Sequence, residues 1–275
     1  MSKIWSRRSG DLRTTNHNLN KIYKFYKSQK MKKVNSLQLS STEELGNFLR
    51  RFSSISSSLL VEIEDGHIKA KTHTPERSVV KSSKIEMSRI FDGDDSEQQV
   101  KFGLYSVDRM LKAFTHFGSG AINFDLHQED TAEGTVGTDI TLKNESLDIN
   151  FQCASLRLFT HISDEMMDKI ADSASADVSF VLTKEMQAKI NSLSGIDADQ
   201  KLLTLSVKGG TVSASGKSFN LNLMNIESDT DISISVYKNQ FAYLDKEDTM
   251  VYLTEDRLIF HSIESDTKMI IGKAE

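Results

Sequence analysis

From Val34 onward, apolar positions follow two different periods along the chain. Four stretches space their apolar residues as one face of a helix does: Leu45 to Phe52, Val107 to Phe114, Met186 to Leu193 and Tyr237 to Leu244. Each stretch is followed by runs in which apolar and polar residues alternate, the pattern of half-buried strands. The sequence therefore predicts four helix-then-hairpin units, which start near residues 42, 106, 183 and 235.

The turns and the helix starts carry their own signals. Asp65-Gly66 and Gly209-Gly210 stand between alternating runs, where a tight hairpin turn needs residues that tolerate positive φ. Ser106, Thr183 and Ser235 precede the last three helical stretches and are candidate N-caps. Strands with one apolar and one polar face are typical of antiparallel sheets, so we expect an α+β fold.

Two units per half is the natural division of the chain. We expect a basic N-terminal extension at 1–33, a first domain at 34–151, an interdomain connector at 152–176 and a second domain at 177–275. Within the connector, Ser163 is placed to cap a short helix from Met166 to Ala171.

The net charge of −5 averages two unlike parts. Residues 1–33 hold ten Lys or Arg against the single acid Asp11, so the remainder carries −14. The extension is either a polyanion-binding arm or a segment outside the folded domain, and Met31 followed by two lysines also reads as an ordinary chain start. With one cysteine and no signal-peptide or membrane-spanning pattern, we expect a cytoplasmic protein.

Enzymatic and metal chemistry finds little support in the residues. His67 and His73 have no further ligand type nearby, and Asp92 to Glu97 lacks the glycine spacing of a calcium loop. Gly216-Lys217-Ser218 ends like a phosphate-binding loop, but position 211, where the first glycine belongs, is Thr. Cys153 has no basic neighbour that would activate it. We therefore expect no enzyme, no metal and no cofactor.

Basic residues recur outside the core-facing stripes of the four helices. Their positive charges suit contact with DNA phosphates, which needs no base-reading side chains. The alternative is an ordinary solvent face, because Glu43, Asp108 and Glu185 lie on the same helices. The candidate DNA-binding residues are Arg50, Arg51, Arg109, Lys112, Lys184, Lys189 and Lys238.

Several stretches resemble the processivity sliding clamps of DNA polymerases, most closely the T-even phage type. The likeness runs from Val34 to Glu275 and is best at Ser36 to Leu39, at Tyr105 to Leu111 and at Thr183 to Gln187. It implies two similar domains per subunit, each with two helices on antiparallel sheet. It also implies a homotrimeric ring whose helices surround double-stranded DNA, with a DNA polymerase and a clamp-loader ATPase as partners in viral replication.

The family also binds short partner peptides in an apolar pocket beside its interdomain connector. The residues that the resemblance places there are Leu156, Leu158, Phe159, Ile162, Ile270 and Ile271, each of which core packing would explain equally well. The basic extension is not part of the family pattern. The rival hypothesis is therefore a non-ring DNA-binding or virion interaction protein that acts through this arm.

Overall fold

The computed structural model describes residues 33–275 except 41, 94–98, 119–120, 133, 161 and 197–198. The first half contains β1 (Lys33–Leu39), α2 (Thr42–Ser53), β2 (Leu59–Glu64), β3 (His67–His73), β4 (Val79–Glu86), β5 (Phe91–Asp92), β6 (Val100–Leu104), α3 (Val107–Phe114), β7 (Ile122–Thr131), β8 (Gly134–Lys143) and β9 (Asp148–Gln152). The second half contains β10 (Val178–Leu182), α5 (Lys184–Ser194), β11 (Leu202–Lys208), β12 (Thr211–Ser215), β13 (Asn220–Asn225), β14 (Ile232–Tyr237), α6 (Lys238–Phe241), β15 (Thr249–Leu253), β16 (Arg257–Ser262) and β17 (Asp266–Gly272). Three short helices, η1 (Met87–Arg89), η2 (Leu156–Leu158) and η3 (Ser173–Ser175), and α4 (Asp164–Ile170) complete the chain.

The elements form four units of one strand, one helix and three strands. Two units interleave in each half, so that the first half has the strand orders β1-β7-β8-β9 and β6-β2-β3-β4. The second half repeats these orders as β10-β15-β16-β17 and β14-β11-β12-β13. The predicted α+β class is confirmed. The hairpin pattern was incomplete, because each helix is followed by three strands rather than two.

Local signals placed three of the four helices correctly. The side chains of Ser106 and Thr183 accept hydrogen bonds from backbone N–H groups at the starts of α3 and α5, and Ser163 does the same for α4. The prediction for Ser235 is wrong. That residue lies in β14, and α6 has a single turn that begins at Lys238. The predicted basic extension lies outside the described residues, except for Lys33 in β1.

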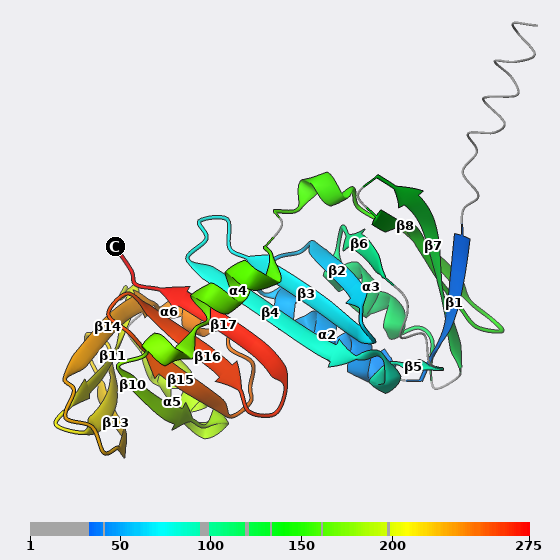
Figure 1. The fold of residues 1–275 in the computed structure, drawn as a ribbon. Coiled ribbons are helices and arrows are strands. Elements are labelled where there is room, and N and C mark those ends of the chain that lie inside the picture. Colours follow the sequence, from blue (N-terminus) through cyan, green and yellow to red (C-terminus); the bar gives the residue numbers. More distant parts are fainter. Residues whose placement is uncertain are drawn as a thin grey trace, which may run out of the picture.

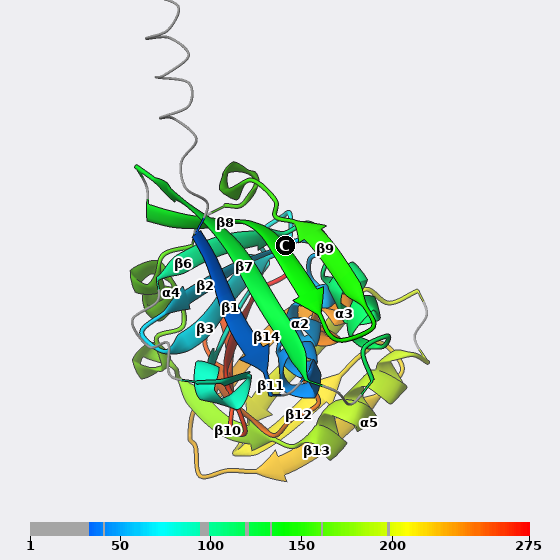
Figure 2. The same cartoon turned by 90° about the vertical axis from the view of Figure 1, so that its right-hand side faces the viewer.

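Two large hydrophobic cores hold the fold together. One gathers apolar residues of the first half, including Phe48, Phe52 and Phe124, and the other gathers those of the second half, including Phe241 and Phe260. The helices α2 and α3 lie behind the β2–β3–β4 strands in Figure 1, whereas α4 crosses the front of the sheet. In Figure 2, α5 lies on the same side as α2 and α3, and α4 lies on the opposite side.

The two halves join through a continuous sheet. β4 of the first half pairs antiparallel with β17 of the second, from Asp266 opposite Lys84 to Ile271 opposite Val79. Side chains also cross this junction: Val79 belongs to the core of the second half, and Ile55 packs against it. We call the β4–β17 pairing and these contacts the internal junction.

A charged cluster is buried beneath the internal junction. Lys81 of β4 has 1% of its side chain exposed, and its Nζ donates to Asp245 Oδ1 at 2.7 Å and to the Tyr243 carbonyl at 2.9 Å. Arg51 of α2 pairs with Asp245 at 3.2 Å and with Glu247 at 2.7 Å. A buried charge is tolerated only when it is paired and hydrogen-bonded, so each half completes the other.

The contact with Arg51 across the internal junction also shifts the pKa of Glu247. Partial burial alone would raise this pKa, but hydrogen bonds from Arg51, Ser262 and Ser265 outweigh it and hold the pKa below its usual value. For Lys81, burial dominates over the attraction of Asp245 and lowers the pKa of the ammonium group. The Glu247 carboxylate is therefore charged at neutral pH, where it offsets the neighbouring Arg51 guanidinium.

Removing one buried carboxylate should cost far more than removing an exposed one. In Asp245→Ala, Lys81 is left buried without its anion, and we expect a loss of about 3 kcal/mol in the free energy of unfolding. Asp266→Ala is the matched control, because the Lys84–Asp266 pair is about half exposed and should be worth less than about 1 kcal/mol. Urea unfolding monitored by circular dichroism measures both, and equal losses would contradict the assignment.

Acid should weaken the internal junction through Glu247. A carboxyl whose pKa is lowered on folding stabilises the native state above its unfolded pKa, and this contribution disappears as the pH falls through the lowered value. We therefore expect the free energy of unfolding to decline below a pH of about 4.5. Glu247→Gln should show a smaller decline than the wild type as the pH is lowered from 7 to below about 4.5, in the same urea titrations.

Candidate nucleic-acid interface and partner surface

The unit helices carry a set of exposed cations. Arg50 lies at the end of α2, Arg109 and Lys112 lie on α3, and Lys184 and Lys189 lie on α5. All five side chains are exposed. Because these helices lie on the face opposite α4, their charges are available to a polyanion on that side.

Two of these cations are held in place by neighbours. The Arg50 guanidinium donates to Asn47 Oδ1 at 2.5 Å, which keeps it along its own helix. The Arg109 guanidinium lies over the Phe151 ring at 5.6 Å from the ring centre, a cation–π contact that leaves its donors exposed. Such contacts position a charge without neutralising it.

Two of the predicted DNA-binding cations, Arg51 and Lys238, are partly buried and engaged by other residues. Arg51 does not face solvent: it is 18% exposed and its guanidinium is engaged by Asp245 and Glu247 in the internal junction. The prediction that it lies free on the helix surface is wrong, because its position on α2 faces the second half. Lys238 is half-buried at the start of α6, and its Nζ donates to the Ser194 carbonyl at 3.3 Å.

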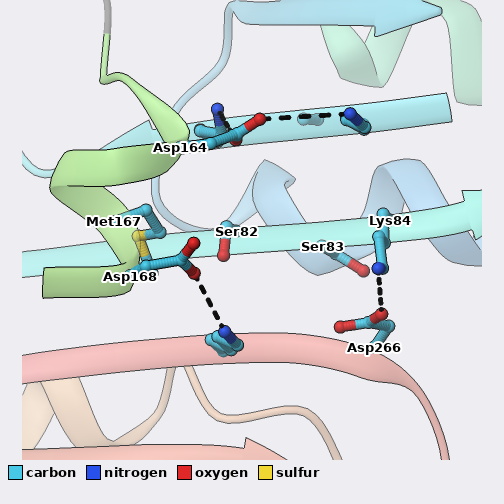
Figure 3. A pocket seen from close by; sticks show the side chains of 11 residues that line it. Ser82, Ser83, Lys84, Asp164, Met167, Asp168 and Asp266 are labelled. Carbon is cyan, nitrogen blue, oxygen red and sulfur yellow. Dashed lines mark hydrogen bonds and ion pairs between the residues drawn. The ribbon is translucent and has the colours of Figure 1, made fainter. Parts of the chain in front are cut away.

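The opposite face is crossed by α4, which straddles the internal junction. Asp164 pairs with Lys71 of β3, and Asp168 pairs with Lys268 of β17 at 3.3 Å. Figure 3 shows α4 above β4 and β17, beside a hollow of about 230 Å³ that also meets Lys84 and Asp266. The connector is thus fastened to both halves by opposite charges.

Electrostatics and packing act together on α4. The hydrogen bond from Lys71 is the main reason that the pKa of Asp164 is lowered. Below the helix, Met167 packs with Ile162, Ile259 and Ile270 in a small third apolar cluster on the outer face of the sheet. Because the carboxylates of Asp164 and Asp168 are exposed and their ion pairs are screened by water, the buried methionine is the stronger attachment.

The structure does not gather the six predicted pocket residues in one place. Ile162 and Ile270 do meet, in the apolar cluster under α4. Ile271 points to the other face and is fully buried in the core of the second half. The other three stand before α4, in or beside η2: Leu156 is half-buried, Leu158 is 67% exposed, and the Phe159 ring covers Gly103 so closely that a Cβ there would clash.

Sequence reasoning missed the strand edges that the fold leaves unpaired. Several of the described strands pair on one side only, β10 and β14 among them. Of these edge strands, β9 pairs only with β8, and β13 pairs only with β12. Figure 2 looks onto the layer formed by β1, β7, β8 and β9, in which β9 is the outer strand. The alternation of Leu221, Asn222 and Leu223 marks β13 as a strand, but no local signal says which neighbour a strand lacks.

Other chemistry is sparse in the described part of the chain. Burial, aided by Asp139, raises the pKa of Cys153 to about 12, so it remains a protonated thiol. No group of three or more His, Cys, Asp or Glu side chains in the described residues is arranged to hold a metal ion. None of the described helices is long and apolar enough to cross a membrane.

The attachment of α4 should depend on Met167. This side chain is 3% exposed, whereas its neighbour Met166 is 54% exposed. We expect Met167→Ala to accelerate amide hydrogen exchange across 164–170 by about tenfold or more, because local opening loses buried apolar contact. Met166→Ala should exchange like the wild type. Equal exchange in the two variants, measured by mass spectrometry, would show that α4 is held by something else.

Comparison with known proteins identifies the fold. No protein-family model matches the sequence, and no curated protein matches it. Among solved structures, the PCNA2–PCNA3 complex of Sulfolobus tokodaii matches with a TM-score of 0.61 at 12% identity, over 87% of this chain and 99% of that one. A PCNA from Entamoeba histolytica matches with a TM-score of 0.63 at 10% identity, over 87% and 98%. A putative DNA polymerase III beta subunit from Eubacterium rectale matches with a TM-score of 0.64 at 14% identity, over 88% of this chain and 66% of that one. The chain therefore has the fold of the sliding clamps.

Proposed function

We propose that this protein is a DNA sliding clamp: copies of the chain form a closed ring around double-stranded DNA and tether a DNA polymerase to it. One observation carries the proposal. Two of the described strands that pair on one side only, β9 and β13, occupy the same places in their halves as the two strands that pair in the internal junction, β17 and β4. The same junction can thus be repeated between copies.

The equivalence of the strands rests on order and on hydrogen bonds. β9 ends the order β1-β7-β8-β9 as β17 ends β10-β15-β16-β17, and β13 corresponds to β4 in the same way. Ala154, two residues past β9, donates its N–H to the Gly103 carbonyl of β6. Ala274, two residues past β17, donates to the Ser235 carbonyl of β14, which is the counterpart of β6. The segments that follow β9 and β17 therefore make equivalent hydrogen bonds in the two halves.

The free edges have matching faces. On β9, Ile149 and Phe151 pack toward the core while the polar residues between them point outward. On β13, Leu221 and Leu223 pack toward the core of the second half, with asparagines alternating on the other face. Pairing β9 of one copy with β13 of the next would continue both layers, and such a head-to-tail contact closes into a ring. Three copies is the number that the resemblance to T-even phage clamps implies.

The charge distribution supports a DNA-filled centre. The exposed cations Arg50, Arg109, Lys112, Lys184 and Lys189 lie on the helix face of a chain whose residues after 33 carry a net charge of −14. An acidic exterior repels DNA and leaves this face attractive. Contacts to phosphates alone are weak and independent of sequence, which suits sliding. The ring then raises the local concentration of a tethered polymerase without chemistry of its own.

The partners follow from this topology. A closed ring has to be opened to reach circular DNA, so we propose a clamp-loader ATPase as a partner and, from the phage resemblance, a viral replicative polymerase as the client. The fold supports peptide docking: an A. fulgidus PCNA structure holds the C-terminal region of FEN-1, and a Helicobacter pylori beta clamp holds a DNA ligase peptide. We place the corresponding surface here at the apolar cluster beside α4, around Ile162 and Ile270.

Charge reversal on the helix face tests the proposal. Changing Arg50, Lys112, Lys184 and Lys189 to Glu should shorten the products of processive synthesis severalfold and reduce the salt dependence of DNA binding, because phosphate contacts are lost. Arg51 is left unchanged, since its substitution would break the internal junction. Lys33→Glu with Lys208→Glu is the control, because both lysines are exposed on strands outside the unit helices, and it should leave product length unchanged.

Removal of the extension separates the rival hypothesis. Residues 1–30 hold eight Lys or Arg against one acid, so a protein that binds DNA through this arm would lose binding when they are deleted. A sliding clamp should retain assembly and processive synthesis after the same deletion. A monomeric product whose DNA binding has vanished would contradict the clamp proposal.

A further inference from the structure

The internal junction contains an apolar contact whose counterpart is exposed. Ile55 lies two residues past the end of α2 and packs across the junction onto the core of the second half. Ile196 lies two residues past the end of α5, the equivalent helix, and is 68% exposed. An isoleucine at the same place in both halves is partly buried where a neighbouring half is present and exposed where none is.

The charged positions of the internal junction also have counterparts. In the β3–β4 hairpin, Lys81 stands opposite Thr72, two pairs beyond the bond that closes the loop between Thr74 and Val79. In the equivalent β12–β13 hairpin, the corresponding position is Leu221, opposite Ala214. The free edge therefore carries an apolar side chain where the internal junction carries its buried lysine.

The facing surface shows the complementary change. Asp245 lies four residues past the end of α6, and the residue four past the end of the equivalent helix α3 is Gly118. The surface that would receive β13 thus lacks the carboxylate that pairs with Lys81. Lysine and carboxylate are absent together, as they must be, because either one alone would leave a buried charge unpaired.

We infer that Ile196 and Leu221 are the apolar anchors of the contact between copies, and that they pack against the α3 and β9 end of a second copy of this chain. This inference rests on the proposed ring, because it extends the internal junction from one chain to the next. The contact between copies is held by apolar packing, whereas the internal junction is held by buried ion pairs. The strength of the contact between copies is therefore less sensitive to acid than that of the internal junction.

A single substitution tests the anchor. Ile196→Asp should raise the protein concentration at which the assembly half-dissociates by at least about tenfold, as measured by light scattering after size exclusion, because interface energy concentrates in a few central side chains. Its thermal unfolding as a monomer should stay unchanged, since Ile196 is exposed there. Ile263→Asp is the matched control: it is 57% exposed, lies in the β16–β17 turn and should assemble normally. Ile196→Val should assemble like the wild type.

The outcomes separate the inference from the proposed function. Normal assembly of Ile196→Asp, or equal weakening by Ile263→Asp, would overturn the anchor while leaving the clamp intact. A wild-type protein that remains monomeric at tens of micromolar would overturn both. An assembly that depends on Ile196 but does not support processive synthesis would keep the anchor and contradict the proposed function.

Discussion

Burial of Lys81 constrains how the two halves meet. With 1% of its side chain exposed, this lysine needs the Asp245 carboxylate, and Asp245 comes from the other half of the chain. Arg51 adds Glu247 to the same cluster. Because neither half can satisfy these charges alone, the pairing of β4 with β17 is fixed in register and the two cores share one sheet. The helices α2, α3 and α5 are thereby held on one face, and α4 lies across the internal junction on the other.

That geometry leaves the two sides of a second such junction unpaired, with β9 at one end of the molecule and β13 at the other. In Figure 1, β13 and the β7–β8 sheet lie at opposite ends. The internal junction can use charges because its two sides are always present in one chain. A strand edge that pairs only after assembly would leave such charges uncompensated in the free chain. The β13 end of this chain instead carries Ile196 and Leu221. Buried charges thus suit the permanent junction inside the chain, and apolar side chains suit the proposed contact between copies.

Local signals in the sequence predicted local structure well and long-range pairing poorly. Ser106 and Thr183 cap their helices as expected, since a cap depends on residues within one turn. The helical spacing from Tyr237 to Leu244 gave a wrong prediction, because Tyr237 ends β14 and the helix that follows it has a single turn. Arg51 fits a solvent-facing position on its helix, and only the approach of Asp245 from 194 residues away shows otherwise. The predicted pocket residues are separated for the same reason: Ile270 and Ile271 are adjacent in sequence but face opposite sides of β17.

The central claim is that β9 of one copy pairs with β13 of the next, as β17 pairs with β4 inside the chain. Electron microscopy of the full-length protein tests this most directly, because head-to-tail and two-fold contacts give different outlines. We expect closed rings of three copies, about three times the 30.9 kDa of one chain, with the unit helices lining a central hole and α4 outside. Single copies, or two-fold dimers joined through β9 alone or β13 alone, would contradict the account.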